Sequence, residues 1–457
     1  MASFAMFAFI GAAKAQNNNV VTYPAPESEA VQTGFSVYAN GQKVDIYKAL
    51  SPQFEGGEYY FAMFDFEGTV EVKINSNRNL EKSEIFPDKF KVLSKKKNEL
   101  VFSADKPFNA SILHEERVMP LIIFGNPVER DIPNKDDPNV VYFGAGVHVQ
   151  KKIALKSNQT LYIAGGAVVK SRIEADGDNI VVRGRGILSG ELFPRFSTGN
   201  LASFKKCKNL AVRDVVFKDP SGWNFVMKDC DGVAVDNLKI CGSRMLNDDA
   251  IDICNTSNVK ITNTFARAQD DIIAVKGMSG KNPCENILVE NCVFWTDIAN
   301  TFRIGFECEA EAMRNIVCRN IDIPFYAVNY RGPEEFWAKG IIWLQAANDM
   351  PMYDIHFENI RIRSNGNDMC VLLANPRVTK HNGSKTAGKV YDCSVKNLSV
   401  VGKKGNFKGL LYFKGADAER DVKNISLENI SYFGEKIDRN YKYLIDEKQF
   451  TSGISVK

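Results

Sequence analysis

The chain has 457 residues, of which 44% are hydrophobic, 25% charged and 11% aromatic. This is the composition of a globular protein, and it excludes intrinsic disorder, a collagen-like chain and a small disulfide scaffold. The net charge is only +3, from 58 Lys and Arg against 55 Asp and Glu, so we expect no nucleic-acid partner. The four His show no HExxH spacing, and GxxxxGK[ST] and GxSxG are absent, which argues against a zinc protease, a phosphate loop and a nucleophile elbow.

The first segment, residues 1–16, contains an apolar stretch from Phe4 to Ala13 that ends in Ala-Lys-Ala before Gln16. This pattern predicts a secretory signal peptide, and therefore a secreted or periplasmic protein, although a buried N-terminal strand is an alternative. No later run of about 18 apolar residues occurs, so we expect no membrane span. The sequence carries no feature that indicates an oligomeric state.

Residues 17–135 contain short segments of alternating apolar and polar residues, separated by Gly, Asn, Asp and Pro every 8–12 residues. Gly34–Ala39, Val70–Ile74 and Phe90–Leu93 are examples. This spacing is typical of a small antiparallel β-sandwich. The polar stretch from Asn134 to Pro138 predicts its boundary with the next domain.

Residues 136–457 contain a repeat in which a polar residue, usually Asn, precedes two alternating runs joined by a polar step. Alternation is the period of a strand with one buried face, and a coil of such strands can bury that face only by stacking on its neighbours. Asn suits the turn because it tolerates left-handed backbone and can hydrogen-bond along the stack. We therefore predict an all-β protein in which a right-handed parallel β-helix follows the sandwich. The repeats begin at Asn179, Asn209, Gly232, Asn258, Asn286, Asn315, Asp354, Asn397 and Asn424.

Ten Cys lie between Cys207 and Cys393, and none forms CxxC. Several precede repeat strands by a few residues, so neighbouring coils would place them about one strand spacing apart, ~4.8 Å. We expect a stack of buried thiols that act as small hydrophobic groups. Disulfides between neighbouring coils are the alternative, because that spacing is within their reach. The stacked positions are Cys207, Cys230, Cys254, Cys284 and Cys393.

Two consecutive coils carry acidic motifs, Asn247–Ile253 and Gln269–Lys276. Asp249 and Asp270 are 21 residues apart, about one coil, so up to four carboxyl groups would share one surface. Crowded carboxylates raise one another's pKa, and a carboxyl group held protonated beside ionised neighbours suits general acid and base catalysis. A hard-cation site, or carboxylates that are simply solvated at turns, are the alternatives.

Further polar and aromatic residues near these motifs could bind substrate. Lys276 and Arg303 could bind a substrate oxygen or offset the negative charge. Trp337, in the polar insertion Arg331–Trp337, is the best candidate for a sugar-stacking platform. The other aromatic candidates are Trp223, Trp295, Phe302, Tyr330 and Trp343. The predicted substrate-binding residues are Asp248, Lys276, Asn300, Arg303, Tyr330 and Trp337.

These motifs resemble those of a known group. Asp219–Trp223, Asn247–Asp249 and Gln269–Asp271 resemble the ordered motifs of the polygalacturonase clan of inverting glycoside hydrolases. Within that clan the chain is most similar to the dextranase and isopullulanase family, which also has a β-sandwich ahead of its β-helix. This second likeness lies in the segments Val141–His148, Leu161–Lys170 and Gly184–Glu191.

The resemblance implies roles for three aspartates. Asp270 would be the general acid that protonates the leaving glycosidic oxygen, while Asp249 and Asp271 would activate the attacking water. In the generic inverting scheme the two carboxyl groups stand ~6.5–9.5 Å apart to admit that water. We therefore expect a metal-independent enzyme with no cofactor, whose substrate is a polysaccharide or oligosaccharide with α-glycosidic linkages, as in the dextranase family.

The chain also departs from polygalacturonases. Where they carry Gly-His-Gly it reads Ala299-Asn300-Thr301, and it has no Arg-Ile-Lys, which disfavours galacturonan. Lys276 and Arg303 nevertheless leave open an acidic or galactose-containing glycan. A Ca²⁺-dependent polysaccharide lyase and a non-catalytic glycan-binding β-helix are the remaining alternatives.

Overall fold

The computed structural model describes residues 19–52, 57–113, 120–197, 199–326, 332–333, 335, 338–378 and 383–457. Residues 1–16, predicted as a signal peptide, lie outside the described residues, as do Tyr330 and Trp337. The described chain is all-β apart from the 3-10 helix η1 (Lys448–Phe450). Within it, no helix has the length and apolar character needed to cross a membrane.

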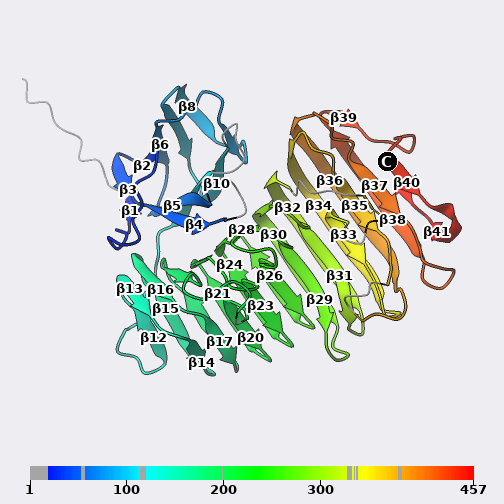
Figure 1. The fold of residues 1–457 in the computed structure, drawn as a ribbon, viewed down its shortest axis with the longest axis horizontal. Coiled ribbons are helices and arrows are strands. Elements are labelled where there is room, and N and C mark those ends of the chain that lie inside the picture. The colour runs from blue at the N-terminus through cyan, green and yellow to red at the C-terminus, as the bar shows by residue number, and fades with distance from the viewer. Residues whose placement is uncertain are drawn as a thin grey trace, which may run out of the picture.

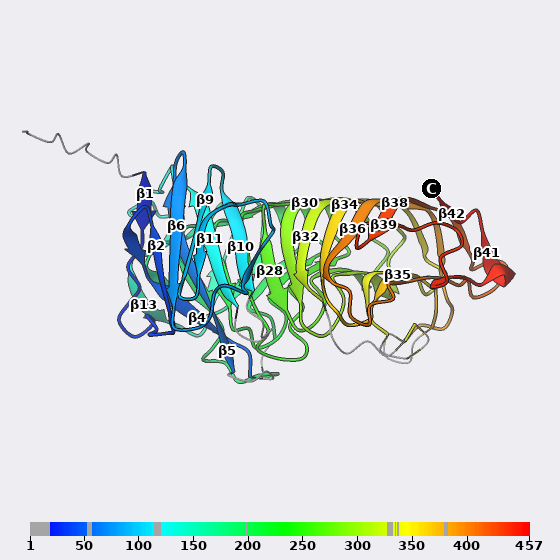
Figure 2. The same ribbon diagram turned by 90° about the horizontal axis from the view of Figure 1, so that it is seen from above.

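The N-terminal strands form two sheets that pack face to face around an apolar core (Figures 1 and 2). All described pairs are antiparallel except β5–β11, which is parallel. The first sheet contains β1 (Val20–Thr22), β4 (Ile46–Leu50), β5 (Glu58–Phe66), β7 (Glu84–Phe86), β10 (Phe108–Leu113) and β11 (Leu121–Pro127). The second contains β2 (Phe35–Ala39), β3 (Gln42–Val44), β6 (Val70–Ser76), β8 (Lys91–Lys96) and β9 (Glu99–Ala104).

From Val140 onward the chain winds into a right-handed parallel β-helix, as predicted (Figure 1). The early coils contain three strands each, and their first two strands belong to one continuous sheet. First strands are β12 (Val140–Phe143), β15 (Thr160–Ile163), β18 (Val181–Arg183), β21 (Lys208–Arg213), β24 (Asp231–Asp236) and β27 (Ser257–Thr262). Second strands are β13 (Gly146–Val149), β16 (Ala167–Lys170), β19 (Ile187–Ser189), β22 (Val216–Lys218), β25 (Lys239–Cys241) and β28 (Phe265–Ala268).

In the later coils the first two strands merge into one long strand. These are β30 (Cys284–Thr296), β32 (Met313–Phe325), β34 (Pro351–Asn365), β36 (Lys389–Lys403) and β38 (Val422–Tyr432). Short strands follow at the C-terminal end, namely β39 (Glu435–Lys436), β41 (Thr451–Ser452) and β42 (Ser455–Val456).

The last strand of a coil, which is the third strand in the early coils, joins a second parallel sheet that carries the candidate site. Its members are β14 (Ile153–Leu155), β17 (Ile173–Asp176), β20 (Ala202–Lys205), β23 (Phe225–Lys228), β26 (Ile251–Cys254), β29 (Ile273–Met278), β31 (Phe302–Glu309), β33 (Gly340–Gln345), β35 (Cys370–Ala374), β37 (Leu410–Phe413) and β40 (Leu444–Asp446). Residues that point inward from both sheets form one continuous apolar core along the solenoid.

Asparagines stack along the turns of the β-helix, which confirms the predicted role of the repeated Asn. Asn320, Asn359 and Asn397 have φ between 55° and 58°, in the left-handed region. The Nδ2 of Asn359 donates to Oδ1 of Asn320, and the Nδ2 of Asn397 donates to Oδ1 of Asn359, each at 2.9 Å. Each amide thus serves as donor to one coil and acceptor from the next.

All ten Cys are buried and none forms a disulfide. Most of them lie in the solenoid core, including the stacked positions Cys207, Cys230 and Cys284. The prediction of a stack of buried thiols is therefore confirmed over the disulfide alternative.

The sandwich packs on the β-helix beside the turns that carry the acidic motifs. Tyr59 and Phe61 of β5 share an apolar cluster with Val216 and Phe265 of the solenoid. The hydroxyl of Tyr59 donates to the carbonyl oxygen of Gly242 at 3.0 Å, at the start of the turn that leads to Asp249. The sandwich therefore contacts and stabilises the turn that leads to Asp249.

Candidate active site

The three candidate catalytic residues occupy the turns that lead into neighbouring strands of the second sheet. Ile251 of β26 is in register with Ile273 of β29, so Asp249 and Asp271, each two residues earlier, are equivalent positions on successive coils. The backbone N–H of Ala250 donates to the carbonyl oxygen of Asp271 at 2.8 Å, which locks these two turns together. Parallel stacking of the coils thus brings residues 22 positions apart side by side.

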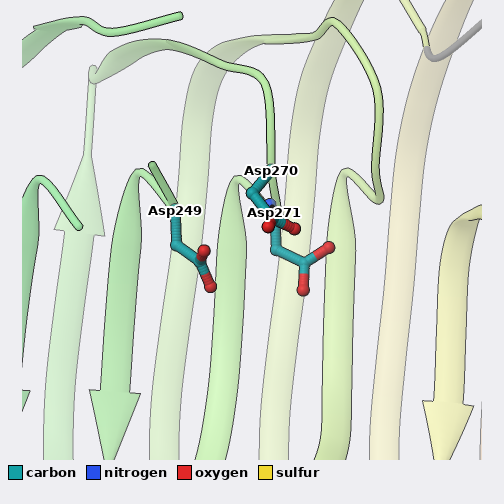
Figure 3. Close-up of side chains that lie close together, drawn as sticks. All are labelled: Asp249, Asp270 and Asp271. Carbon is teal, nitrogen blue, oxygen red and sulfur yellow. Dashed lines mark hydrogen bonds between the residues drawn. The ribbon is translucent and has the colours of Figure 1, made fainter. Parts of the chain in front are cut away.

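Figure 3 shows that Asp249, Asp270 and Asp271 gather at the tops of adjacent strands. One carboxylate oxygen from each lies within 4.8 Å of the others. Asp249 and Asp271 are buried, with 2% and 8% of their surface exposed, whereas Asp270 is half-buried. The structure therefore brings together all three residues predicted to be catalytic, and leaves Asp270 the most accessible.

Asp270 is placed to hold a proton. Burial raises its pKa well above the ordinary value, and the negative charges of Asp249 and Asp271 add to the effect. Lys276 opposes this rise. A carboxyl group that stays protonated beside two other carboxylates can donate that proton, which is what a general acid must do.

Asp249 forms an ion pair with a buried lysine. The Nζ of Lys276 lies 2.6 Å from Oδ2 of Asp249 and 2.7 Å from Oδ1 of Asp252. Burial raises the pKa of Asp249, and the ammonium of Lys276 lowers it. Oδ1 of Asp249 has no hydrogen-bond partner in the described structure. Asp249 is thus anchored through one oxygen, while its other oxygen is buried without a partner in the described structure.

Asp252 was not singled out by the sequence, yet it completes this buried group. It lies on β26, three residues after Asp249, and is fully buried. Alternation along β26 was the available signal, because Asp252 falls on the face opposite to the inward-pointing Ile251 and Ile253. The ammonium of Lys276 therefore serves two carboxylates rather than one.

Asn300 hydrogen-bonds to Asp271, and its predicted role in substrate binding stays a prediction. Its backbone N–H and its Nδ2 both donate to Oδ1 of Asp271, at 3.0 and 2.7 Å. Its Oδ1 accepts the N–H of Gly340 at 2.8 Å. Asn300 occupies the coil position equivalent to Asp271, so an amide follows the carboxylates along the stack and stabilises the last of them.

Asp248 hydrogen-bonds within the protein, and its predicted role as a substrate ligand stays a prediction. It is fully buried, and its two oxygens accept the backbone N–H groups of Ser243, Arg244, Gln269 and Asp270. Burial raises its pKa to about 8, against the effect of these amide donors. Asp248 therefore ties the two acidic turns together. Adjacent Asp side chains point in opposite directions here, so Asp248 turns inward while Asp249 joins the site.

Arg303 and Lys276 lie beside the carboxylates, but both are already engaged. Arg303 is buried, with its guanidinium 3.8 Å from the ring centroid of Trp343, and it donates to Oε1 of Gln345 at 2.7 Å. Burial lowers its pKa, and the charges of Asp271 and Asp270 act in the opposite direction. Lys276 offsets the negative charge of Asp249 and Asp252, and binding of substrate by Lys276 or Arg303 stays a prediction.

Among the aromatic candidates that the structure describes, Trp223 lies beside the carboxylates. It is half-buried, occupies the coil position before Asp249, and lies with its ring centroid 3.7 Å from the Nζ of Lys276. Trp295, Phe302 and Trp343 are buried, so they are packing residues and not platforms. Tyr330 and Trp337 lie outside the described residues and remain predictions.

The three carboxylates could also ligate a cation, since their oxygens are close enough to share one. The ammonium of Lys276 already pairs with Asp249 and would repel a divalent ion at that position. The donor set therefore fits a proton-transfer site better than a calcium site.

The observed spacing is shorter than the generic inverting scheme predicts. That scheme separates two carboxyl groups by ~6.5–9.5 Å, whereas the nearest oxygens here lie within 4.8 Å of one another. Three carboxyl groups rather than two share this site, and their oxygens are close enough for one water molecule to hydrogen-bond to two of them.

Comparison with known proteins identifies the segment that carries these residues. Residues 151–297 match the sequence profile described as Glycosyl hydrolases family 28. Over 83 residues, 18% of this chain, the sequence is 35% identical to Rhamnogalacturonase A from Aspergillus niger. The chain spans about 17% of the length of that relative.

Solved structures share the fold over nearly the whole chain. Dex49A from Penicillium minioluteum has a TM-score of 0.72 at 12% identity, with 95% of this chain and 96% of that chain covered. The Family 28 Exopolygalacturonase from Yersinia enterocolitica has a TM-score of 0.50 at 13% identity, with 96% and 95% covered. Together with the family match, these likenesses confirm the resemblance to the polygalacturonase clan of glycoside hydrolases and the dextranase-like fold.

Proposed function

We propose that the protein is an inverting glycoside hydrolase that cleaves α-linked oligosaccharides or polysaccharides without a metal ion. The convergence of Asp249, Asp270 and Asp271 carries this proposal, because one of the three is accessible and held protonated while the other two are anchored by Lys276 and Asn300. The match of this segment to a glycoside hydrolase family supports the reaction class.

The reaction follows from this arrangement. The carboxyl group of Asp270 gives its proton to the glycosidic oxygen as the bond from that oxygen to the anomeric carbon breaks. A water molecule attacks the anomeric carbon from the opposite face, and its proton passes to Asp249 or Asp271. The leaving sugar then carries the proton of Asp270, the new hemiacetal carries the water oxygen, and the configuration inverts.

A neutral α-glucan is the substrate that the site favours. Lys276 pairs with two carboxylates, so it presents no unpaired charge to a uronic acid, while Arg303 packs on Trp343 and donates to Oε1 of Gln345. The fold likeness to Dex49A covers both the sandwich and the β-helix. Trp223, beside Asp249, offers a ring face on which a sugar can stack.

A screen of purified protein on defined polysaccharides tests this proposal. We expect dextran or a related α-glucan to be cleaved, with the anomer formed first, observed by NMR, having the configuration opposite to that of the bond cleaved. Retention of configuration would contradict the proposed mechanism. Activity should persist in the presence of a chelator.

The second candidate is hydrolysis of an acidic or galactose-containing glycan, which the likeness to Rhamnogalacturonase A favours. Polygalacturonate and rhamnogalacturonan in the same screen distinguish it. A lyase acting on these polymers would instead leave an unsaturated uronide that absorbs in the ultraviolet and would require Ca²⁺.

We also propose that the protein is exported. Residues 1–16 support this through their apolar stretch and Ala-Lys-Ala ending. Expression of the full chain, followed by N-terminal sequencing of the exported protein, should show a start at Gln16. A cell-retained protein that begins at its first residues would contradict export.

A further inference from the structure

A cavity lies between the sandwich and the β-helix, away from the three aspartates. Figure 2 shows β10 of the sandwich beside β28 and β30 of the solenoid, where this cavity forms. Its volume is about 520 Å³, within the ~300–1,000 Å³ typical of small-molecule sites. The residues that matter for its chemistry are Lys89, Asn109, Asp322, Asn359, Arg361 and Ser399.

Two acceptor groups in this cavity have no protein donor. Asn109 is 8% exposed, and its Nδ2 donates to the carbonyl oxygen of Asn263 at 3.1 Å, but its Oδ1 is buried with no partner in the described structure. Within the same described residues, the carboxyl group of Asp322 forms no hydrogen bond and no ion pair. Buried polar atoms without partners are rare in native proteins, so Oδ1 of Asn109 points to a ligand, and the half-buried Asp322 adds a second acceptor to the lining of the cavity.

The Asn stack forms one wall of the cavity and adds unused hydrogen-bonding capacity. Asn291, Asn320, Asn359 and Asn397 line it. Each amide has two N–H donors and two acceptor lone pairs, and the stack uses one N–H of Asn359 and one lone pair of its oxygen. The wall therefore presents a row of donors and acceptors repeated at the strand spacing of ~4.8 Å.

The charged residues of the cavity, Lys89, Asp322 and Arg361, carry both signs. Asp322, Arg361 and Ser399 are in register on neighbouring strands, and all three line the cavity. Burial raises the pKa of Asp322, while Lys89 and Arg361 lower it. Arg361 also pairs with Asp88 of the sandwich. A ligand with strong net charge gains little here, whereas one with many hydroxyl groups matches the alternating donors and acceptors.

We propose that this cavity is a second, non-catalytic binding site for a neutral oligosaccharide. Sugar hydroxyls would donate to Asp322 and to Oδ1 of Asn109, and would accept from the free N–H groups of the Asn stack. The site would hold a glycan on a different face of the solenoid from the one that carries Asp249, Asp270 and Asp271.

Calorimetric titration of the Asp270→Asn protein with neutral trisaccharides (isomaltotriose, maltotriose and cellotriose) tests this site without cleavage. We expect at least one to bind, Asp322→Asn to weaken that binding about tenfold, and Ser399→Trp, which fills the cavity, to abolish it. Asp105→Asn, a matched change at an exposed residue outside the cavity, should leave it unchanged. Thermal melting verifies that each variant folds.

Absence of binding by every trisaccharide would overturn the proposal, as would binding that survives both Asp322→Asn and Ser399→Trp. The latter result would place the ligand at another site. Preferential binding of trigalacturonate over all the neutral sugars would also overturn it. Asp322→Asn should leave cleavage of short substrates by the otherwise native protein unchanged, so failure of this site and failure of the proposed hydrolase activity are distinguishable.

Discussion

Two stacks of side chains in this β-helix obey the same geometry and differ in chemistry. Asn320, Asn359 and Asn397 repeat on successive coils, as do Asp249 and Asp271. An amide both donates and accepts, so stacked Asn side chains hydrogen-bond to one another. An ionised carboxylate only accepts, and stacked carboxylates repel. The first stack stabilises the solenoid. The second is stabilised by the ammonium of Lys276, by the hydrogen bonds from Asn300 and by the proton that Asp270 retains.

This contrast supports our proposal that the acidic turns are a functional site. For stability alone, an amide is the better residue at this coil position, because it can donate to its neighbour. Asn300 is such an amide, on the coil after Asp271. Carboxylates there raise one another's pKa and reduce stability, and proteins retain such arrangements mainly where chemistry requires them. The predictions below test whether the acidic stack serves reaction and the amide stack serves stability.

The largest expected effect is on catalysis. Asp270→Asn removes the proton donor, so we expect the rate of glycan cleavage to fall about 10²- to 10⁴-fold, the usual contribution of a general acid. Product release from the polysaccharide cleaved by the parent protein measures this. Because the change also removes a carboxyl group from a crowded cluster, the melting temperature should stay the same or rise. A variant that keeps parental activity would show that the acidic stack is not catalytic.

The residue next to the acidic stack should behave in the opposite way. Asp248→Ala leaves four buried backbone N–H groups without their acceptor, so we expect a loss of about 3–5 kcal/mol in the free energy of unfolding. Chemical denaturation measures it. Asp270→Ala is the matched control, with little change in stability expected. Equal stability of the two variants would contradict the division of roles between these neighbouring turns.

The ion pair beneath the acidic stack is open to a third test. Lys276→Met leaves Asp249 and Asp252 buried without a counterion, so we expect a loss of about 3 kcal/mol in unfolding free energy. The loss should be larger at pH 8 than at pH 5, because burial raises the folded-state pKa of both carboxyl groups and their protonation at low pH removes the unpaired charge.

Lys276 should also move the pH dependence of the residual activity. Its charge lowers the pKa of Asp270, so its removal should shift the alkaline limb of the pH–rate profile to higher pH. Lys423→Met, at a half-exposed surface pair with Asp421, is the control and should change stability by less than about 0.5 kcal/mol. An unmoved alkaline limb would separate Asp270 from the rate-determining proton transfer.

The smallest effect is expected in the amide stack. Asn359→Ala removes two exposed hydrogen bonds and places alanine, whose Cβ disfavours left-handed backbone, at a φ of 55°. We therefore expect the free energy of unfolding to fall by about 1–2 kcal/mol with activity unchanged. Asn359→Gly removes the amide alone and should lose less. If Asn359→Ala abolished cleavage instead, the amide stack would take part in the reaction itself.

Several features could be predicted because they depend on periodicity. Alternation along each strand and Asn at each turn predicted the β-helix, and the 21-residue offset between Asp249 and Asp270 predicted that the acidic turns meet. The burial of Asp248 could not be predicted, because two adjacent residues in a turn diverge and backbone φ and ψ decide which one turns inward. The contact between Asn300 and Asp271 could not be predicted either, because the two residues belong to different coils.

By itself, the sequence determined that the chain forms stacked coils and that aspartates recur at neighbouring turns, because both follow from local residue patterns. Only the tertiary structure decided that the pKa of Asp270 is raised and that Lys276 pairs with both Asp249 and Asp252. It also decided that a cavity forms between the sandwich and the β-helix beside the Asn stack. Burial and cross-coil contacts set these properties, and they depend on residues that are distant in the chain.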